Sequence, residues 1–340
     1  MTLRSRQTGL SLVELMVSIT LGLMILSGVL VVFVNTSAAR NEVERTSRQI
    51  ENGRYATELL SEDLRLAGFY GELDHGSIPA PGALPADPCS LTVANWNAWM
   101  PVHIQGYDNG TGLAATTCVL ANLRPNTDVV VIRRARTCVA GVAGCDAAVN
   151  GKPYVQASLC STQAVQHKLG LEGTAGLFDR QKKNCDAADP AGKREYLVRI
   201  YFVSNDNGAG QNVPTLKRLE LTGAGWDTVP LVEGIEEFQL QYGIDGDSDG
   251  VPDAYVADPT TYPIAAPTPL PSWMNVVTVQ FHLLARNLET SPNYVDTKTY
   301  HLGNDAAGNE IQIAPGQGFR RHVYSSLVRI ANPAGRRDTP

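Results

Sequence analysis

The sequence predicts an α+β protein in which a long N-terminal helix, membrane-spanning in its first half, packs on an antiparallel β-sheet with a cysteine-rich loop insertion. An apolar run at the N-terminus continues into a segment with helical spacing. Later segments are rich in β-branched and aromatic residues and are bounded by Gly, Pro or Asn. All six cysteines lie between residues 85 and 190. A helix followed by antiparallel strands is typical of a two-layer α+β domain.

The first predicted element is the membrane-spanning half of the helix, residues 10–34. This run contains one charged residue, Glu14. About 25 residues at a rise of ~1.5 Å give a helix of roughly 37 Å, which exceeds a bilayer core of about 30 Å. A charged side chain at that depth costs about 2.5 kcal/mol or more, so we expect Glu14 to be functional and to need a cation. Arg4 and Arg6 before the run predict a cytoplasmic N-terminus and an outward-facing remainder of the chain.

The residues RQTG at 6–9, followed by LSLVELMVSITLGLMILSGV, resemble the class III signal of type IV pilins. In that family a prepilin peptidase cuts after the glycine and methylates the new terminus. The resemblance therefore implies a leader at residues 1–9, cleavage after Gly9 and N-methylation of Leu10. Glu14 would then be mature residue five, which in the family pairs with the terminus of a neighbouring subunit during assembly. Leu10 departs from the family's usual Phe, and we interpret it as another large apolar side chain.

Two other interpretations of this N-terminus stay open. A secretory signal peptide has an apolar core of about 7–15 residues and a small-residue cleavage site, which residues 37–39 before Arg40 could imitate. The apolar core here is longer than that. The second alternative is a signal anchor that is never cut. Both alternatives leave Glu14 without an explanation.

Residues 35–69 are predicted to continue the helix as an amphipathic half. No proline occurs between the apolar run and Pro79, although Gly53 weakens the middle of this segment. Gly68 is the expected end of the helix. The apolar residues that recur at helical spacing among polar ones, and that we expect to pack on a sheet, are Val43, Ile50, Leu60, Leu64 and Ala67.

We interpret residues 70–193 as a loop-rich, disulfide-bearing insertion with one strand near 128–134. An even number of cysteines in a segment outside the cytoplasm predicts disulfides, and the absence of a C-x-x-C motif argues against a zinc or thioredoxin-like site. Local closures cost the least chain entropy, which favours sequential pairing. The predicted pairs are Cys89 with Cys118, Cys138 with Cys145, and Cys160 with Cys185.

Residues 194–340 are predicted to form an antiparallel β region. Several of its runs alternate in polarity, as expected for strands with one buried face. The predicted strands are residues 196–203, 216–221, 235–242, 276–284, 298–302 and 322–330.

The resemblance extends into this region. The segments Glu233–Phe238, Gln241–Asp245 and Tyr324–Asn332 look like those of the larger minor pilins of the PilW type. This resemblance implies a type IV pilin-like fold and a minor pilin that joins other minor pilins and the major pilin to prime pilus assembly, and so supports twitching motility and adhesion. It also implies a bacterial inner-membrane protein with a periplasmic C-terminal domain that later enters the pilus fibre.

An acidic loop at residues 245–253 has the pattern of the first half of an EF-hand loop. Its carboxylates occupy relative positions 1, 3, 5 and 9, and a glycine occupies position 6. Val256 stands where an EF-hand has its bidentate Glu, and the loop follows a strand, so we expect a variant, structural calcium site. The alternative is a solvated acidic turn. The predicted ligands are Asp245, Asp247, Asp249 and Asp253, with the carbonyl of Val251.

Composition and motifs favour a structural protein over other classes. The net charge of −6 and the lack of a basic stripe argue against nucleic-acid binding. No H-E-x-x-H, G-x-S-x-G or P-loop motif occurs, so we expect neither an enzyme nor a small-molecule substrate. Two other functions remain alternatives: a calcium-dependent surface-binding module at a pilus tip, and a pseudopilin of a type II secretion system. The scattered histidines that carry no catalytic motif are His75, His103, His167, His282, His301 and His322.

Overall fold

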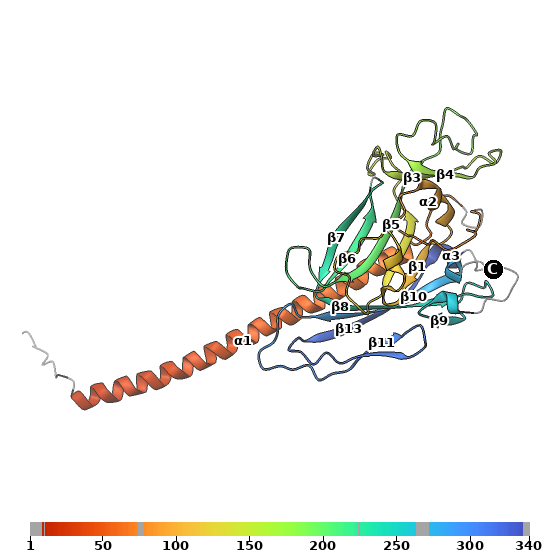
Figure 1. Cartoon of the computed structure of the whole chain (residues 1–340). Helices are drawn as coiled ribbons and strands as arrows, with labels where there is room; N and C mark the ends of the chain where they lie inside the picture. Colours follow the sequence, from red (N-terminus) through yellow and green to blue (C-terminus); the bar gives the residue numbers. More distant parts are fainter. Residues whose placement is uncertain (1–8, 10, 74–77, 224, 263–271, 336–340) are drawn as a thin grey trace, which may run out of the picture. The chain divides into compact units, whose positions relative to one another are not determined.

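The computed structural model describes residue 9 and residues 11–73, 78–223, 225–262 and 272–335 (Figure 1). Its longest element is helix α1, Leu12–Arg65. The chain divides into two compact units, residues 1–48 and residues 49–340. Helix α1 begins in the first unit and ends in the second.

The first unit contains the apolar half of α1. The large apolar side chains between Leu12 and Val34 are exposed in this single chain. By length and composition α1 could cross a membrane. The polar residues that follow include Glu44 and Arg48, which form an ion pair one turn apart.

The second unit contains a seven-stranded antiparallel sheet. Its main path is β1-β2-β5-β3-β4, and β6 and β7 continue from the other end of β5. The central strand, β5, pairs with β2, β3 and β6. The strands are β1 (Ile104–Tyr107), β2 (Val129–Ala135), β3 (Pro153–Ala157), β4 (His167–Leu171), β5 (Lys193–Ser204), β6 (Thr215–Leu221) and β7 (Trp226–Glu233).

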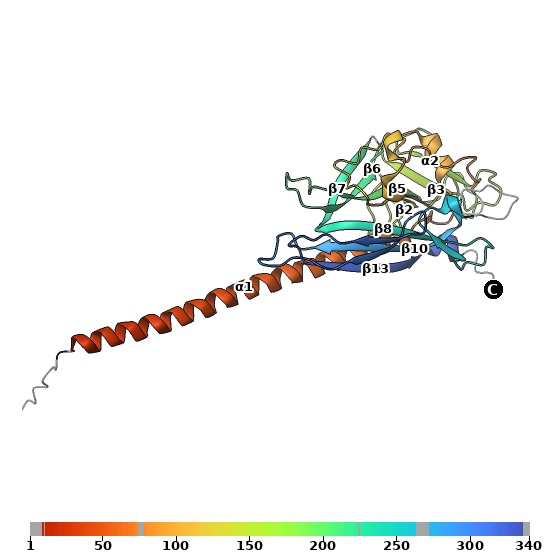
Figure 2. The ribbon, with the colours of Figure 1, turned by 60° about the horizontal axis from the view of Figure 1, so that its bottom comes forward.

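A second antiparallel sheet has the order β13-β10-β8-β9, and a hairpin, β11–β12, stands beside it. Figure 2 shows β8, β10 and β13 as one layer and β5, β6 and β7 in another. The strands are β8 (Ile235–Ile244), β9 (Ala254–Val256), β10 (Val276–Arg286), β11 (Tyr300–Asn304), β12 (Glu310–Ile313) and β13 (Arg321–Arg329). The short helices are α2 (Val93–Trp99), η2 (Asp108–Gly110), η3 (Leu113–Ala115), η4 (Pro259–Thr261), η5 (Ser272–Asn275) and α3 (Ala331–Gly335).

The end of α1 packs into a core that both sheets share. Ala56, Leu60 and Leu64, which lie on one face of the helix, are fully buried. A second core covers the opposite face of the seven-stranded sheet and includes Trp96 from α2. Strand β2 is buried on both faces, which explains its nearly continuous apolar run. The sheet residues of the shared core include Val130, Ile132, Tyr201, Val203, Phe238, Leu240, Val279 and Phe281.

A buried ion network also ties α1 to the seven-stranded sheet. Asp63 is 3% exposed and its Oδ1 accepts hydrogen bonds from Arg134 Nε at 2.6 Å and Arg199 at 3.1 Å. The hydroxyl of Tyr201 donates to Oδ2 at 2.6 Å. Burial by itself raises the pKa of Asp63. The combined effect of Arg199, Arg134 and Tyr201 lowers this pKa by more than burial raises it, so the pKa lies below its ordinary value.

The three disulfides join the cysteine pairs that local closure predicts. All six cysteines are paired, with Cα–Cα distances of 5.1, 5.7 and 5.0 Å in chain order. Cys89 and Cys160 are buried at 2% and 1% exposure. The pairs are Cys89–Cys118, Cys138–Cys145 and Cys160–Cys185.

In residues 70–193 the strand predicted near 128–134 is confirmed as β2 and the disulfides are present, but the segment contains more strands than the one predicted. This segment contains α2 and strands β1 to β4, and both β2 and β3 pair with β5. Strands β1, β3 and β4 were not predicted because each has only four or five residues, too few to establish a period of two. The segment is therefore part of the main sheet.

The other predicted strands are confirmed with small shifts at their ends. They correspond to β2, β5, β6, β8, β10, β11 and β13. Strand β7 was missed because Pro230 interrupts a largely exposed segment, and β9 and β12 were missed because they are short. Helix α1 ends at Arg65, before the predicted boundary at residue 69.

Candidate functional site

Glu14 lies in the first turn of α1 and forms a reciprocal cap with Ser11. The backbone N–H of Glu14 donates to Ser11 Oγ at 3.2 Å, and the N–H of Ser11 donates to Glu14 Oε2 at 3.0 Å. This is the capping box of an S-x-x-E sequence, which satisfies two helix-end donors at once. The sequence predicts Glu14 as a charge within an apolar run and, by the resemblance, as the partner of a neighbouring subunit's terminus, but its role as a helix cap was not predicted. The S-x-x-E spacing was the signal for this cap.

The carboxylate of Glu14 is exposed, and no residue that the structure describes forms an ion pair with it. Gly9 is exposed, whereas Leu10 and residues 1–8 lie outside the described residues. A carboxylate in the first helical turn faces the positive end of the helix dipole. Ser11, which donates to this carboxylate, is the second residue after the predicted cleavage point in the sequence.

The acidic loop 245–253 gathers three of its predicted ligands. Asp245 is fully buried, and its carboxylate accepts N–H donors from Ser248 at 2.6 Å and Gly250 at 3.0 Å. One carboxylate oxygen from each of Asp245, Asp247 and Asp253 lies within 4.8 Å of the others. Calcium binds six to eight oxygens at about 2.3–2.6 Å, so these three carboxylates fit a calcium ion.

Asp249 does not join this group. Its Oδ1 accepts the backbone N–H of Val251 at 2.7 Å, as in a local Asx turn. The carbonyl of Val251 stays a predicted ligand. The N–H of Asp249 by itself lowers the pKa of Asp247. Desolvation and the carboxylates of Asp249, Asp253 and Asp245 together raise this pKa by more, so it lies above its ordinary value. Like charges crowd this loop, and a cation would relieve their repulsion.

The histidines do not form a site in the described part of the chain, and His75 lies outside it. His282 is 8% exposed and its Nδ1 lies 2.7 Å from Ser325 Oγ, which agrees with its interpretation as a strand residue. Burial lowers the pKa of His282. His103 is buried with Nε2 at 2.9 Å from the carbonyl of Val276, and His301 pairs with Glu310.

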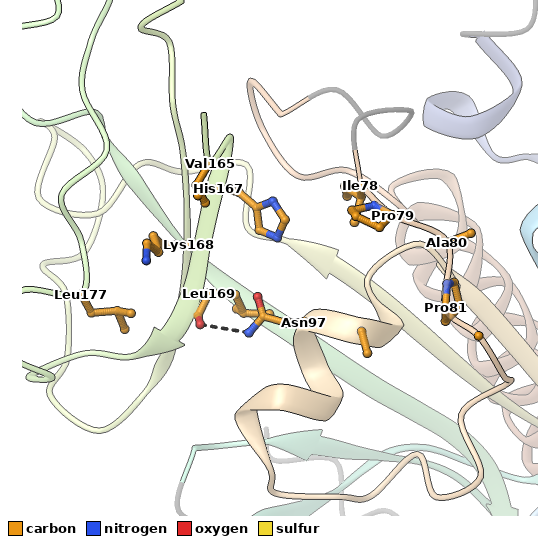
Figure 3. Close-up of a pocket in the computed structure, with 12 residues that line it drawn as sticks. Ile78, Pro79, Ala80, Pro81, Asn97, Val165, His167, Lys168, Leu169 and Leu177 are labelled. Atoms are coloured by element: carbon orange, nitrogen blue, oxygen red, sulfur yellow. Dashed lines mark hydrogen bonds between the residues drawn. The ribbon is translucent and has the colours of Figure 1, made fainter. Parts of the chain in front are cut away.

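A cavity of about 660 Å³ opens between residues 78–82, helix α2 and strand β4 (Figure 3). Its walls are largely apolar, with polar groups from Asn97, His167 and Lys168. The side chain of Asn97 donates to the carbonyl of Leu169 at 3.2 Å. Burial lowers the pKa of His167, which favours its neutral form. Residues 78–82 precede Cys89, helix α2 lies within the Cys89–Cys118 loop, and β4 lies within the Cys160–Cys185 loop.

Two family models match the chain. The prokaryotic N-terminal methylation motif matches residues 4–30, and the type IV pilus-assembly protein W model matches residues 200–332. The first match includes Gly9 and Glu14, and the second includes the loop 245–253. The methylation motif and the apolar half of α1 together indicate membrane anchoring.

The chain is also similar to a solved structure, a type IV-like pilin from Thermus thermophilus. The identity is 15%, the TM-score is 0.27, and the match covers 62% of this chain and 81% of that chain. A comparison with curated proteins finds no match. The two family models, one at each end of the chain, support a type IV pilin of the PilW type.

Proposed function

We propose that this chain is a minor pilin that takes part in priming and assembling type IV pili after cleavage following Gly9 and N-methylation of Leu10. The observation that carries the proposal is the position of Glu14 in the first helical turn, at the head of an exposed apolar helix and five residues after Gly9 in the sequence. The proposed function is structural, and the match to the type IV pilus-assembly protein W model supports it.

The physical mechanism has two stages. Before assembly, the apolar half of α1 is stored in the bacterial inner membrane with the C-terminal region in the periplasm. During assembly, the exposed side chains between Leu12 and Val34 exchange lipid for the helices of other minor pilins and of the major pilin. In this low-dielectric environment the Glu14 carboxylate pairs with the α-ammonium group of a neighbouring subunit. An unpaired charge there would be strongly unfavourable, so the pairing sets the register between subunits.

The test separates the charge of Glu14 from its capping role. Glu14→Gln keeps the capping box, since Gln also serves at this position, but removes the charge. Ser11→Ala removes the cap and keeps the charge. Each variant is expressed in the host, and its amounts in membranes and in sheared fibres are compared by immunoblot. We expect Glu14→Gln and Glu14→Ala to insert normally but to be depleted from fibres, while Ser11→Ala incorporates. Wild-type incorporation of Glu14→Gln would refute the pairing.

We also propose that loop 245–253 binds a structural calcium ion through Asp245, Asp247 and Asp253. The carboxylate geometry and the raised pKa of Asp247 support this proposal. Calcium should raise the melting temperature of the detergent-purified full chain. This increase should shrink in the double variant Asp247→Asn, Asp253→Asn. An equal calcium-dependent increase in melting temperature in the variant and the wild-type chain would exclude the loop as the calcium site.

A second candidate function is adhesion by the disulfide-bearing region, and the cavity between residues 78–82 and β4 favours it. In this case the chain would be a calcium-dependent surface-binding module near the pilus tip. Lys168→Ala should then reduce attachment of cells to a surface without reducing the amount of the chain in fibres. Unchanged attachment would remove this candidate. The pseudopilin alternative predicts co-purification with a type II secretion filament instead of a pilus supporting twitching motility.

A further inference from the structure

Strand β4, which forms one wall of the cavity in Figure 3, is the last strand on its side of the seven-stranded sheet. Among the strands that the structure describes, it pairs with β3 alone. At one end of this ladder the N–H of Ser158 donates to the carbonyl of Gln166 at 2.7 Å, and at the other the N–H of Glu172 donates to the carbonyl of Lys152 at 2.8 Å. In an antiparallel ladder only every second residue bonds to the partner strand. The even-numbered residues of β4 therefore bond to β3, and the backbone groups of the odd-numbered residues point away from it.

The outward groups of β4 are only partly used. The carbonyl of Leu169 accepts the side-chain amide of Asn97 on α2 at 3.2 Å, and the carbonyl of Leu171 accepts the N–H of Thr174 at 3.3 Å. No described residue bonds to the N–H or the carbonyl of His167, or to the N–H of Leu169. We call these three groups the β4 edge. An unpaired strand edge is a template on which another chain can pair.

The cavity runs along the β4 edge, because residues from both faces of the strand line it. His167 and Lys168 are neighbours in a strand, so their side chains lie on opposite faces, and both line the cavity. Leu177 also lines it and covers the face of Lys168, since a Cβ atom at Gly170 would overlap its side chain. Figure 3 shows Lys168 and Leu177 on one side of β4 and His167 on the other, toward residues 78–82. A cavity that reaches both faces of a strand passes its open edge.

The opposite wall of the cavity cannot complete the sheet. Residues 78–82 belong to no helix or strand, and they include Pro79 and Pro81. Proline has no backbone N–H and cannot donate to a ladder. This wall therefore offers an apolar surface to an occupant without pairing with β4 itself. The volume of about 660 Å³ lies within the range of about 300–1,000 Å³ that is usual for ligand sites.

Lys168 gives the cavity a positive charge that the protein does not neutralise there. None of the described residues that line the cavity is acidic. Among the ion pairs of the described residues, none includes Lys168. The neighbouring carboxylate of Asp179 instead pairs with Arg180, whose guanidinium group lies 2.7 Å from its Oδ1. An occupant with a carboxylate group would therefore complement the charge of this cavity.

We propose that the β4 edge binds an extended, acidic peptide segment of a partner protein, which adds one strand to the seven-stranded sheet. The peptide backbone bonds to the free groups of His167 and Leu169. Its apolar side chains pack against residues 78–82, and a Glu or Asp side chain pairs with Lys168. In this mode of recognition the main chain supplies affinity and alternate side chains supply specificity. The inference concerns the cavity of the adhesion candidate, but it requires neither cleavage after Gly9 nor entry into a filament.

The first test selects peptides from a phage-displayed library of random peptides on the full chain in detergent. We expect the enriched peptides to contain Glu or Asp among β-branched residues. Each enriched peptide is then synthesised in two N-methylated forms that carry the methyl groups on alternate sets of amides, and its affinity is measured by fluorescence anisotropy. Only one set of amides faces the β4 edge, so one form should lose binding and the other should keep it. Absence of enriched peptides, or equal affinity of the two forms, would overturn the proposal.

Variants of the chain locate the peptide on β4. His167→Pro removes an N–H that the ladder with β3 does not use, and His167→Ala controls for the loss of the side chain. We expect His167→Pro to bind the selected peptides about tenfold more weakly than His167→Ala. Lys168→Glu should also weaken binding about tenfold, whereas Lys183→Glu, at an exposed position in the same disulfide loop, should not.

Wild-type affinity in both His167→Pro and Lys168→Glu would overturn the proposal. The adhesion candidate fails separately. If the peptides bind as expected while cells that carry Lys168→Ala attach normally, the cavity binds a peptide without serving attachment, and this inference stands.

Discussion

Asp63 shows how single residues hold α1 to the seven-stranded sheet. Its buried carboxylate accepts hydrogen bonds from Arg134, Arg199 and Tyr201. Asp63→Asn keeps the shape but leaves the buried guanidinium group of Arg134 without its ion-pair partner and that of Arg199 with Glu220 alone, so we expect a loss of about 3–5 kcal/mol in the free energy of unfolding. Thermal unfolding of the full chain in detergent measures it. Glu62→Gln, at the exposed neighbouring position, is the control and should change stability little.

The pH dependence of this contribution has a defined sign. The folded-state pKa of Asp63 lies below its ordinary value. The contribution is therefore fully present above the unfolded pKa of about 3.9 and is lost as the pH falls through the lower folded pKa. The wild-type chain should thus lose more stability than Asp63→Asn between pH 5 and the acid limit. Parallel acid-unfolding curves for the two chains would contradict the role of Asp63.

At the residue scale, the sequence could predict what depends on neighbours along the chain. The three cysteine pairs and the turn around Asp245 are local features that the sequence predicted, and the spacing of Gly9 and Glu14 lies within the matched methylation motif. The buried, hydrogen-bonded position of Asp128 could not be predicted, since the backbone N–H groups that it accepts belong to Asn109 and Leu240, which are distant in sequence. Asp249 was predicted as a ligand because position 5 of an EF-hand is one; in the structure its carboxylate accepts the backbone N–H of Val251, two residues further along the chain.

At the element scale, Gly53 explains how α1 approaches the second sheet. A Cβ atom at this position would overlap the ring of Tyr324 on β13. In an exposed helix Gly→Ala would gain about 1 kcal/mol. Here we expect Gly53→Ala to lose about 1–3 kcal/mol through overpacking, as measured by thermal unfolding.

The double variant provides the control for this prediction. In a Tyr324→Ala background the ring is gone, so Gly53→Ala should become neutral or stabilising. A loss of the same size in both backgrounds would show that the contact with Tyr324 is not the cause. From the sequence, Gly53 is only a weak point of the helix, because its contact depends on a residue 271 positions away.

The disulfides should differ in their contribution to stability. The pair Cys89–Cys118 separates residues by 29 positions, and Cys138–Cys145 by 7. The loop-entropy model gives about 3.6 kcal/mol for the longer loop and about 2.4 kcal/mol for the shorter one. Cys89 is also buried in a hydrophobic core, so its removal adds a packing loss. Differential scanning calorimetry of the two paired Cys→Ala variants should show the larger decrease for Cys89–Cys118, and the reverse order would be inconsistent with both arguments.

At the scale of the whole chain, the fold class could be predicted but the topology of the middle segment could not. Helix α1 and strands β5, β8 and β10 could be predicted, because each has a long run of residues with a clear hydrophobic period. The short strands β1, β3 and β4 are held by pairing with neighbours, which a sequence pattern of four or five residues does not reveal. The same segment also lies outside both family-model matches, which cover residues 4–30 and 200–332.

The central claim is that the chain is processed as a prepilin and enters a filament. It rests on the N-terminal signal, the exposed apolar half of α1 and the two family models. The most direct test is the intact mass and N-terminal sequence of the chain recovered from membranes of its host. We predict a chain that begins with N-methylated Leu10. A chain that begins at Arg40 or retains Met1 would contradict the claim, because no α-ammonium would then form beside Glu14.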